Sequence, residues 1–268
     1  MEKILFDAHS HLNYNGYTED ERAIAISVIE ESAVCGVIDV GYDLSSSVRA
    51  VSHAGKYPWC FAAAGMLPVD GAAEYINDRD AALNKLVELS KMPGMVAIGE
   101  IGLEYVKGET DDKEKARQAE QFRAQIAVAR ELDLPVVIHD RDSHGDVMRI
   151  LKEERAFDGA GVMLHCYSGH TEQALEYSSL GAMISLAGQL TWSNARKSVE
   201  VAANVPDANL LIETDAPFLT PEPHRGKKNV SPYIEFTARR LAEIRGMEYE
   251  KVAEVTRENT MRFFGVSL

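Results

Sequence analysis

The five residues from Pro135 to His139, which read PVVIH, indicate the kind of sheet on which this chain is built. They are apolar without alternation until they end on a histidine, whereas a strand with one face in water alternates apolar and polar residues. A continuous apolar run is typical of a strand that is buried on both faces, as in a parallel sheet. The same character recurs in VMLH at 162–165 and LLIE at 210–213. The chain is therefore expected to fold around a parallel sheet.

Eight short strands are predicted along the chain, and stretches with helical spacing separate them. The strands are expected at Ile4–Asp7, Gly36–Val40, Trp59–Gly65, Met95–Gly99, Pro135–His139, Gly161–His165, Gly181–Leu186 and Leu210–Asp215. Strands that alternate with helices form βαβ units, and eight such units in 268 residues match the size of an α/β (β/α)8 TIM barrel. We therefore predict a single barrel domain over residues 1–268.

Helix signals are clear at both ends of the chain. Thr18 and Glu21 have the spacing of a capping box, which begins a helix. Ser231 before a proline predicts the N-cap of a helix over Pro232–Arg245. A last helix is expected over Tyr249–Phe264, so the barrel should carry an additional C-terminal helix.

Charge and cysteine content indicate in which compartment the protein works and which partners it binds. The formal net charge is −14, from 28 basic and 42 acidic residues, which argues against a broad basic face that coats nucleic acid. A phosphate-bearing substrate stays compatible, because divalent cations bring their own positive field. Three cysteines without a CxxC pair suit a reducing compartment, and no apolar run is long enough to span a membrane or form a signal segment. We expect a cytoplasmic protein that needs neither a membrane nor an obligate protein partner.

The residue types that bind metals best stand at the ends of the predicted strands. They are His9, His11, Glu100, His139, His165 and Asp215. The carboxyl ends of barrel strands converge on one mouth, where enzymes with this fold keep their chemistry. Four imidazoles and two carboxylates can hold two divalent ions, and a His-rich set suits Zn²⁺, Mn²⁺ or Fe²⁺ better than Ca²⁺. The alternative is a structural role, in which the histidines only fill the top of the barrel.

The remaining histidines and the cysteines are expected to have ordinary roles. Four histidines do not end apolar runs and are expected at the surface: His53, His144, His170 and His224. Cys35 and Cys60 lie among apolar residues and are expected in the core. Cys166 follows a proposed ligand directly, so on a strand it would face the other way and is not expected to bind metal.

Six short motifs together resemble a known family. DAHSHL (7–12), IGEIGL (98–103), VIHDR (137–141), HCYSG (165–169), ETDAP (213–217) and PEPHRGKKN (221–229) are similar to the motif series of the TatD-related metal-dependent hydrolases, within the amidohydrolase superfamily. The resemblance extends from residue 7 to about residue 265. It implies that the six residues above bind two divalent ions, zinc, manganese or magnesium, with Glu100 bridging them. The implied reaction is hydrolysis of small phosphodiesters or of nucleic-acid ends, especially 3′-to-5′ trimming of DNA or RNA by a deoxyribonuclease.

Further roles follow from position and from the resemblance. Glu100 and Asp215 are expected to be catalytic, with Asp215 giving general-base help. Arg141 should reach the mouth and hold a phosphate or carboxylate, unless it pairs with a surface acid instead. Asp7 and Glu213 each precede a proposed ligand by two residues and are expected to support the site by hydrogen bonds.

The irregular loop from Thr220 to Pro232 is expected to form part of the active-site rim. Arg225 and Asn229 within it match the family pattern and are expected to bind substrate or to shape the loop. Two positions depart from that pattern. Leu67 stands where family members usually have the histidine of GxHP, which is thought to touch substrate phosphate, and Glu104 stands where they often have the aspartate of GLD. The first departure removes a hydrogen-bond donor from the substrate site, whereas the second keeps a carboxylate.

Two other functions stay open at this point. The same two-metal site could hydrolyse carboxylic esters, lactones or amides, as a deacylase does, and the apolar Leu67 favours such a substrate. A non-catalytic metal-binding protein with the same fold is the third reading. The complete set of ligand-type residues argues against it.

Overall fold

The computed structural model describes residues 2–106 and 110–268, and it is built on one eight-stranded sheet whose strand order follows the sequence. The strands are β1 Leu5–Ser10, β2 Val34–Val40, β3 Cys60–Ala64, β4 Met95–Glu104, β5 Val136–Arg141, β6 Val162–Leu164, β7 Met183–Leu186 and β8 Leu210–Ile212. Each strand pairs in parallel with the next one along the chain. The predicted parallel sheet of eight strands is confirmed.

Hydrogen bonds between the two ends of the sheet bring it close to a closed barrel. The backbone N–H of Asp215, just after β8, donates to the carbonyl of His9 in β1 at 2.9 Å. The N–H of His11 donates in turn to the carbonyl of Ala216 at 2.7 Å. The polypeptide around three of the proposed ligands, His9, His11 and Asp215, therefore also joins the first strand to the last.

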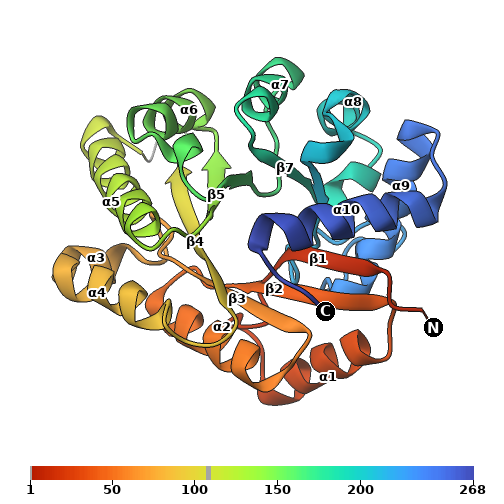
Figure 1. The fold of residues 1–268 in the computed structure, drawn as a ribbon, viewed down its shortest axis with the longest axis horizontal. Helices are drawn as coiled ribbons and strands as arrows, with labels where there is room; N and C mark the ends of the chain where they lie inside the picture. Colours follow the sequence, from red (N-terminus) through yellow and green to blue (C-terminus); the bar gives the residue numbers. More distant parts are fainter. Residues whose placement is uncertain (1, 107–109) are drawn as a thin grey trace.

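Helices surround the strands as an outer ring (Figure 1). They are α1 Glu19–Glu30, α2 Leu44–Lys56, α3 Ala72–Asn77, α4 Arg79–Leu89, α5 Asp112–Glu131, α6 His144–Glu153, α7 Thr171–Ser179, α8 Arg196–Asn204, α9 Ile234–Arg245 and α10 Tyr249–Phe264. The last helix, α10, lies beside β1 and β8 and is the predicted addition to the barrel. Within the described residues, none of these helices is both long enough and apolar enough to cross a membrane.

Buried side chains fill the inside of the barrel. The inner cluster consists of Phe6, Ala8, Ile38, Val40, Ala63, Ala97, Val137, Met163, Met183 and Leu211 from the strands, with Phe264 from α10. A second and larger cluster packs the outer face of the sheet against the helices. This double burial is the physical reason for the continuous apolar runs in the sequence. The interior is a packed core and not a channel, so chemistry is confined to the mouth.

Element boundaries differ from the prediction where the mouth is built. β4 was expected to end at Gly99 but continues to Glu104, and its register against β5 shifts between Ile98 and Ile101. Gly102 permits this extension, because it has φ +152° and a Cβ there would lie 1.9 Å from the carbonyl oxygen of His139. Glu100 therefore lies within a strand and not at its end.

Two other boundaries were wrong near the C-terminus. β8 ends at Ile212, three residues before Asp215, whose φ of +55° is incompatible with a strand. Ser231 is not the N-cap of a long helix: it begins a short 3₁₀ turn, Ser231–Tyr233, and α9 starts only at Ile234. The capping box of Thr18 and Glu21 at the start of α1 is confirmed, and α10 has the predicted bounds.

Candidate metal centre

The structure brings all six proposed ligands together at the C-terminal mouth of the barrel. His9 and His139 lie on β1 and β5, and Glu100 lies inside β4. The other three, His11, His165 and Asp215, follow β1, β6 and β8 directly or within three residues. Their atoms form three overlapping groups that could each hold a metal ion: His9, His11 and Glu100; His9, His165 and Asp215; Glu100, His139 and His165.

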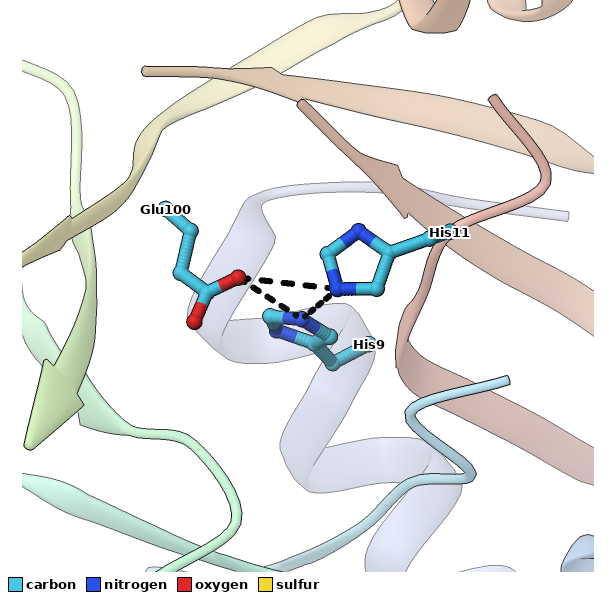
Figure 2. Close-up of side chains that lie close together, drawn as sticks. All are labelled: His9, His11 and Glu100. Atoms are coloured by element: carbon cyan, nitrogen blue, oxygen red, sulfur yellow. Dashed lines mark hydrogen bonds and ion pairs between the residues drawn. The ribbon is translucent and has the colours of Figure 1, made fainter. Parts of the chain in front are cut away.

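Glu100 divides its two carboxylate oxygens between two pairs of imidazoles. Oε2 lies 3.5 Å from Nε2 of both His9 and His11, the arrangement drawn in Figure 2. Oε1 lies 2.7 Å from Nδ1 of His139 and 2.7 Å from Nε2 of His165. One carboxylate can therefore contribute an oxygen to each of two ions.

The spacing within each imidazole pair fits metal coordination. The facing nitrogens of His9 and His11 are 3.2 Å apart, and those of His139 and His165 are also 3.2 Å apart. Two nitrogens bound at about 2.0–2.1 Å to one tetrahedral ion are separated by about 3.3–3.4 Å. Asp215 completes the first pair, because its Oδ1 lies 3.3 Å from Nε2 of His11.

Hydrogen bonds behind the histidines leave the inward nitrogens free to bind metal. Nδ1 of His11 lies 2.7 Å from the carbonyl of Val40, which only accepts, so Nδ1 keeps its hydrogen and Nε2 presents the lone pair when the imidazole is neutral. Nδ1 of His165 lies 3.2 Å from a carboxylate oxygen of Glu213, with the same consequence. Such partners orient ligating imidazoles and raise their basicity.

His139 is turned the other way round. Its Nδ1 faces Glu100, and its Nε2 lies 3.3 Å from Oε2 of Glu104. Glu104 thus stands behind His139 as Glu213 stands behind His165. In the sequence, Glu104 was notable only as a departure from the GLD motif. Its contact with His139 was not predicted, because this contact depends on the extension of β4.

The two supporting acids differ in what they contact. Glu213 is buried, and besides His165 it accepts a hydrogen bond from the backbone N–H of Cys166 at 2.8 Å. Asp7 accepts a hydrogen bond from the backbone N–H of His9 at 3.4 Å and two from Thr214, from the backbone N–H at 2.9 Å and from the hydroxyl at 2.6 Å, but none from the ring of His9. Asp7 therefore ties β1 to the segment after β8. Burial raises its pKa to about 7 against the opposing effect of these hydrogen bonds.

Burial and neighbouring charges set the ionisation of the ligands. For His11, burial lowers the pKa, but the hydrogen bond and charge of Asp215 raise it to about 9. For Glu100, burial raises the pKa, but His165 and the other imidazoles hold it well below its usual range. Glu100 is therefore an ionised carboxylate, as a metal ligand must be, and a divalent ion that binds here displaces protons from imidazoles.

A pocket of about 420 Å³ opens above these ligands, and it includes two of the proposed substrate residues. Leu67, with 7% of its surface exposed, lies in its wall. The side chain of Arg141 is 65% exposed at the rim and lies 3.3 Å from Oε1 of Glu104. Arg141 thus reaches the mouth and also pairs with an acid, and its binding of a substrate phosphate or carboxylate stays a prediction.

The other two proposed substrate residues lie outside the lining of this pocket. The guanidinium of Arg225 stacks 4.5 Å from the ring of Trp192. Asn229 is fully buried, and its amide donates to the carbonyls of Thr214 at 2.9 Å and Phe218 at 2.7 Å. The geometry of Asn229 is that of a residue that shapes the loop after β8.

Three expectations about the remaining histidines and one omission need correction. His224 is half-buried, and its ring stacks on that of Tyr233 with the centroids 4.2 Å apart. His53 is buried and not at the surface, because its Nδ1 lies 2.7 Å from the buried carboxylate of Asp39. His144 is half-buried against Asp140 at 2.8 Å. Phe218 was not predicted, because it lies in an irregular segment without periodicity, but it lines the pocket with 45% of its surface exposed.

Comparison with known sequences supports one family. The family described as TatD related DNase matches residues 6–265. YabD of Bacillus subtilis, named as a metal-dependent hydrolase, is 40% identical over 264 residues, which cover 98% of this chain and 100% of YabD. A protein of Citrobacter koseri named 3′-5′ ssDNA/RNA exonuclease TatD is 30% identical over 98% of this chain and 100% of its own.

Comparison with solved structures gives the same result. YjjV of Escherichia coli, a TatD homologue, has a TM-score of 0.87 and 27% identity, with complete coverage of both chains. A TatD-family hydrolase of Entamoeba histolytica has a TM-score of 0.83 at 21% identity over 98% of this chain and 99% of its own, which shows the shared fold.

Proposed function

The chain belongs to the TatD-related DNase family, and we propose that it is a metal-dependent hydrolase that cleaves phosphodiester bonds at nucleic-acid ends, in the manner of a 3′-to-5′ exonuclease. The observation that carries this proposal is the divided carboxylate of Glu100, with one oxygen toward His9 and His11 and the other toward His139 and His165. We assign two divalent ions to these two groups, with zinc, manganese and magnesium as candidates.

The protein groups around the pocket have separable tasks in this reaction. Two divalent ions, when bound, lower the pKa of a water nucleophile and neutralise charge on the transferring phosphoryl group. Asp215 lies at the mouth and accepts the proton of the attacking water. Burial raises its pKa, but the hydrogen bond from His11 lowers it below the usual value, so Asp215 is ionised and able to act as a base.

Residues at the rim of the metal pocket bind the substrate in this proposal. Arg141 presents a largely exposed guanidinium, whose fork geometry matches two phosphate oxygens. Asn229 holds the backbone of the loop after β8 in place, and Arg225 on the same loop is exposed and stacks on Trp192. We treat the whole chain as one catalytic unit that works in the cytosol, which its three free cysteines suit.

A second candidate is hydrolysis of carboxylic esters or lactones by the same metal site. Leu67 favours it, since an apolar side chain lines the pocket where a phosphate would gain from a hydrogen-bond donor. A neutral ester loses nothing at such a wall.

The test is an activity panel on protein of defined metal content. Chelated protein is reloaded separately with Zn²⁺, Mn²⁺ or Mg²⁺ and given single-stranded DNA, RNA, bis-p-nitrophenyl phosphate, and a set of esters and lactones. We expect chelation to abolish activity and one of these metals to restore cleavage of the phosphodiesters. Turnover by fully chelated protein would contradict the metal mechanism, and a preference for esters or lactones would select the second candidate.

A further inference from the structure

A second pocket, of about 320 Å³, adjoins the metal pocket and shares three residues with it. The shared residues are His11, Leu67 and Phe218. The other walls include Tyr14 and Tyr42. A group bound in the second pocket therefore lies next to the group that is bound at the metals.

Phe218 stands in the shared wall on a fixed backbone. Its N–H donates to the carbonyl of Asp215 at 2.8 Å, and its own carbonyl accepts from the amide of the buried Asn229 at 2.7 Å. Its ring meets those of His11 and Tyr14 edge-on, with centroids at 6.2 and 5.3 Å. The residue is nevertheless 45% exposed and lines both pockets, so an aromatic side chain on a hydrogen-bonded backbone is offered to the cleft.

The charge of the second pocket limits what it can accept. Asp43 and Asp70 lie in its wall, and among its lining residues there is no lysine or arginine. A phosphate would be repelled there, whereas the rim of the metal pocket carries the guanidinium of Arg141. A flat, uncharged group with hydrogen-bond donors on its edge fits aromatic walls and carboxylate acceptors.

We propose that the second pocket binds the base of a nucleotide adjoining the scissile phosphodiester, and that the base stacks on Phe218. This inference rests on the proposed function and deepens it, because it separates the path of the sugar-phosphate backbone, past Arg141, from the place of the base. The proposal also assigns a role to Leu67, whose apolar side chain lines both pockets and contacts the base.

The experiment compares oligonucleotides that differ by one base. Short single-stranded DNA is prepared intact, with an abasic terminal nucleotide, or with an abasic penultimate nucleotide. Each is given to metal-loaded wild type, Phe218→Ala, Phe218→Trp and Leu175→Ala. The last is a matched control that shortens an exposed apolar side chain on α7, away from the mouth. Binding is read independently of cleavage from the fluorescence of 2-aminopurine at either position, which stacking quenches.

We expect removal of one of the two bases to lower the kcat/KM of the wild type by roughly 5-fold to 150-fold, the range for a single stacked base. Phe218→Ala should lose a similar factor on intact DNA and lose nothing more on the abasic strand. Phe218→Trp should keep the preference, and Leu175→Ala should behave as wild type.

Two failures can be told apart. A wild type that cleaves intact and abasic strands equally, or a Phe218→Ala variant that keeps the preference for the base, overturns the base pocket and leaves the proposed function standing. A wild type that neither binds nor cleaves any strand overturns the proposed function and the base pocket together.

Discussion

The metal side of the mouth and its substrate side are built in different ways. On the metal side, His9, Glu100 and Glu213 are almost completely buried, and a carboxylate or carbonyl stands behind three of the four imidazoles. On the substrate side, 45% of the surface of Phe218 and 65% of the side chain of Arg141 are exposed, and both residues line the pocket. Many contacts determine the geometry of the first side, so a change there should remove activity. Changes on the second side should instead alter which substrate is used.

The strongest test of this comparison is Glu100→Gln. The substitution keeps the shape but removes the charge that two ions would share, and it leaves four imidazoles around a neutral amide. We expect kcat to fall by more than the ~100-fold that loss of a residue behind a ligand can cost. Metal content, measured by elemental analysis after dialysis, should fall in parallel. Glu131→Gln, an exposed position at the end of α5, is the control. A variant that keeps two ions and normal turnover would show that Glu100 is no bridge.

Glu213→Gln tests the residues that support the proposed ligands by hydrogen bonds, since Glu213 lies against Nδ1 of His165. The amide can still accept a hydrogen bond from His165, but the loss of charge makes that imidazole a weaker ligand. We expect metal affinity to fall by roughly 10–100-fold, with activity recovered at high metal concentration. Titration calorimetry measures the affinity, and Glu176→Gln on the surface of α7 serves as the matched control. Activity that stays low at saturating metal would mean that Glu213 acts on the substrate directly.

On the substrate side, Leu67→His restores the donor that family members usually have. One hydrogen bond to a charged group is worth about 1.5–3 kcal/mol, so phosphodiesterase kcat/KM should rise roughly tenfold or more. Leu67→Met, which keeps the wall apolar, should change little. If the natural substrate is an uncharged ester or lactone, Leu67→His should instead impair that reaction and leave phosphodiesterase activity low. Vigorous nuclease activity in the wild type, unchanged by the histidine, would show that this position does not contact phosphate.

The same contrast explains what could be read from the sequence. Strands buried on both faces appear in the sequence as apolar runs, and barrel geometry brings the polar residues near their carboxyl ends to one mouth, so the grouping of the six proposed ligands was predictable. The contact of Glu104 with His139 was not predictable, because this contact depends on an extension of β4 that Gly102 permits. The burial of His53 depends on Asp39, which is distant in the chain. Phe218 lies in a segment without periodicity, and its exposure follows from hydrogen bonds to Asp215 and Asn229.

The smallest expected effect belongs to Arg141→Ala, and it locates the border between the two sides. The guanidinium is 65% exposed and shares its charge with Glu104, so its attraction for a phosphate is screened by water and salt. Exposed ion pairs contribute about 0.2–1 kcal/mol, which predicts a rise in KM of at most roughly fivefold, with kcat nearly unchanged. This rise in KM should be smaller at high salt than at low salt. The control Arg149→Ala, on the outer surface of α6, should leave KM unchanged. If Arg141→Ala instead lowers kcat by more than tenfold at constant KM, the guanidinium stabilises the transition state. Arg141 would then act with the metal side despite its exposure.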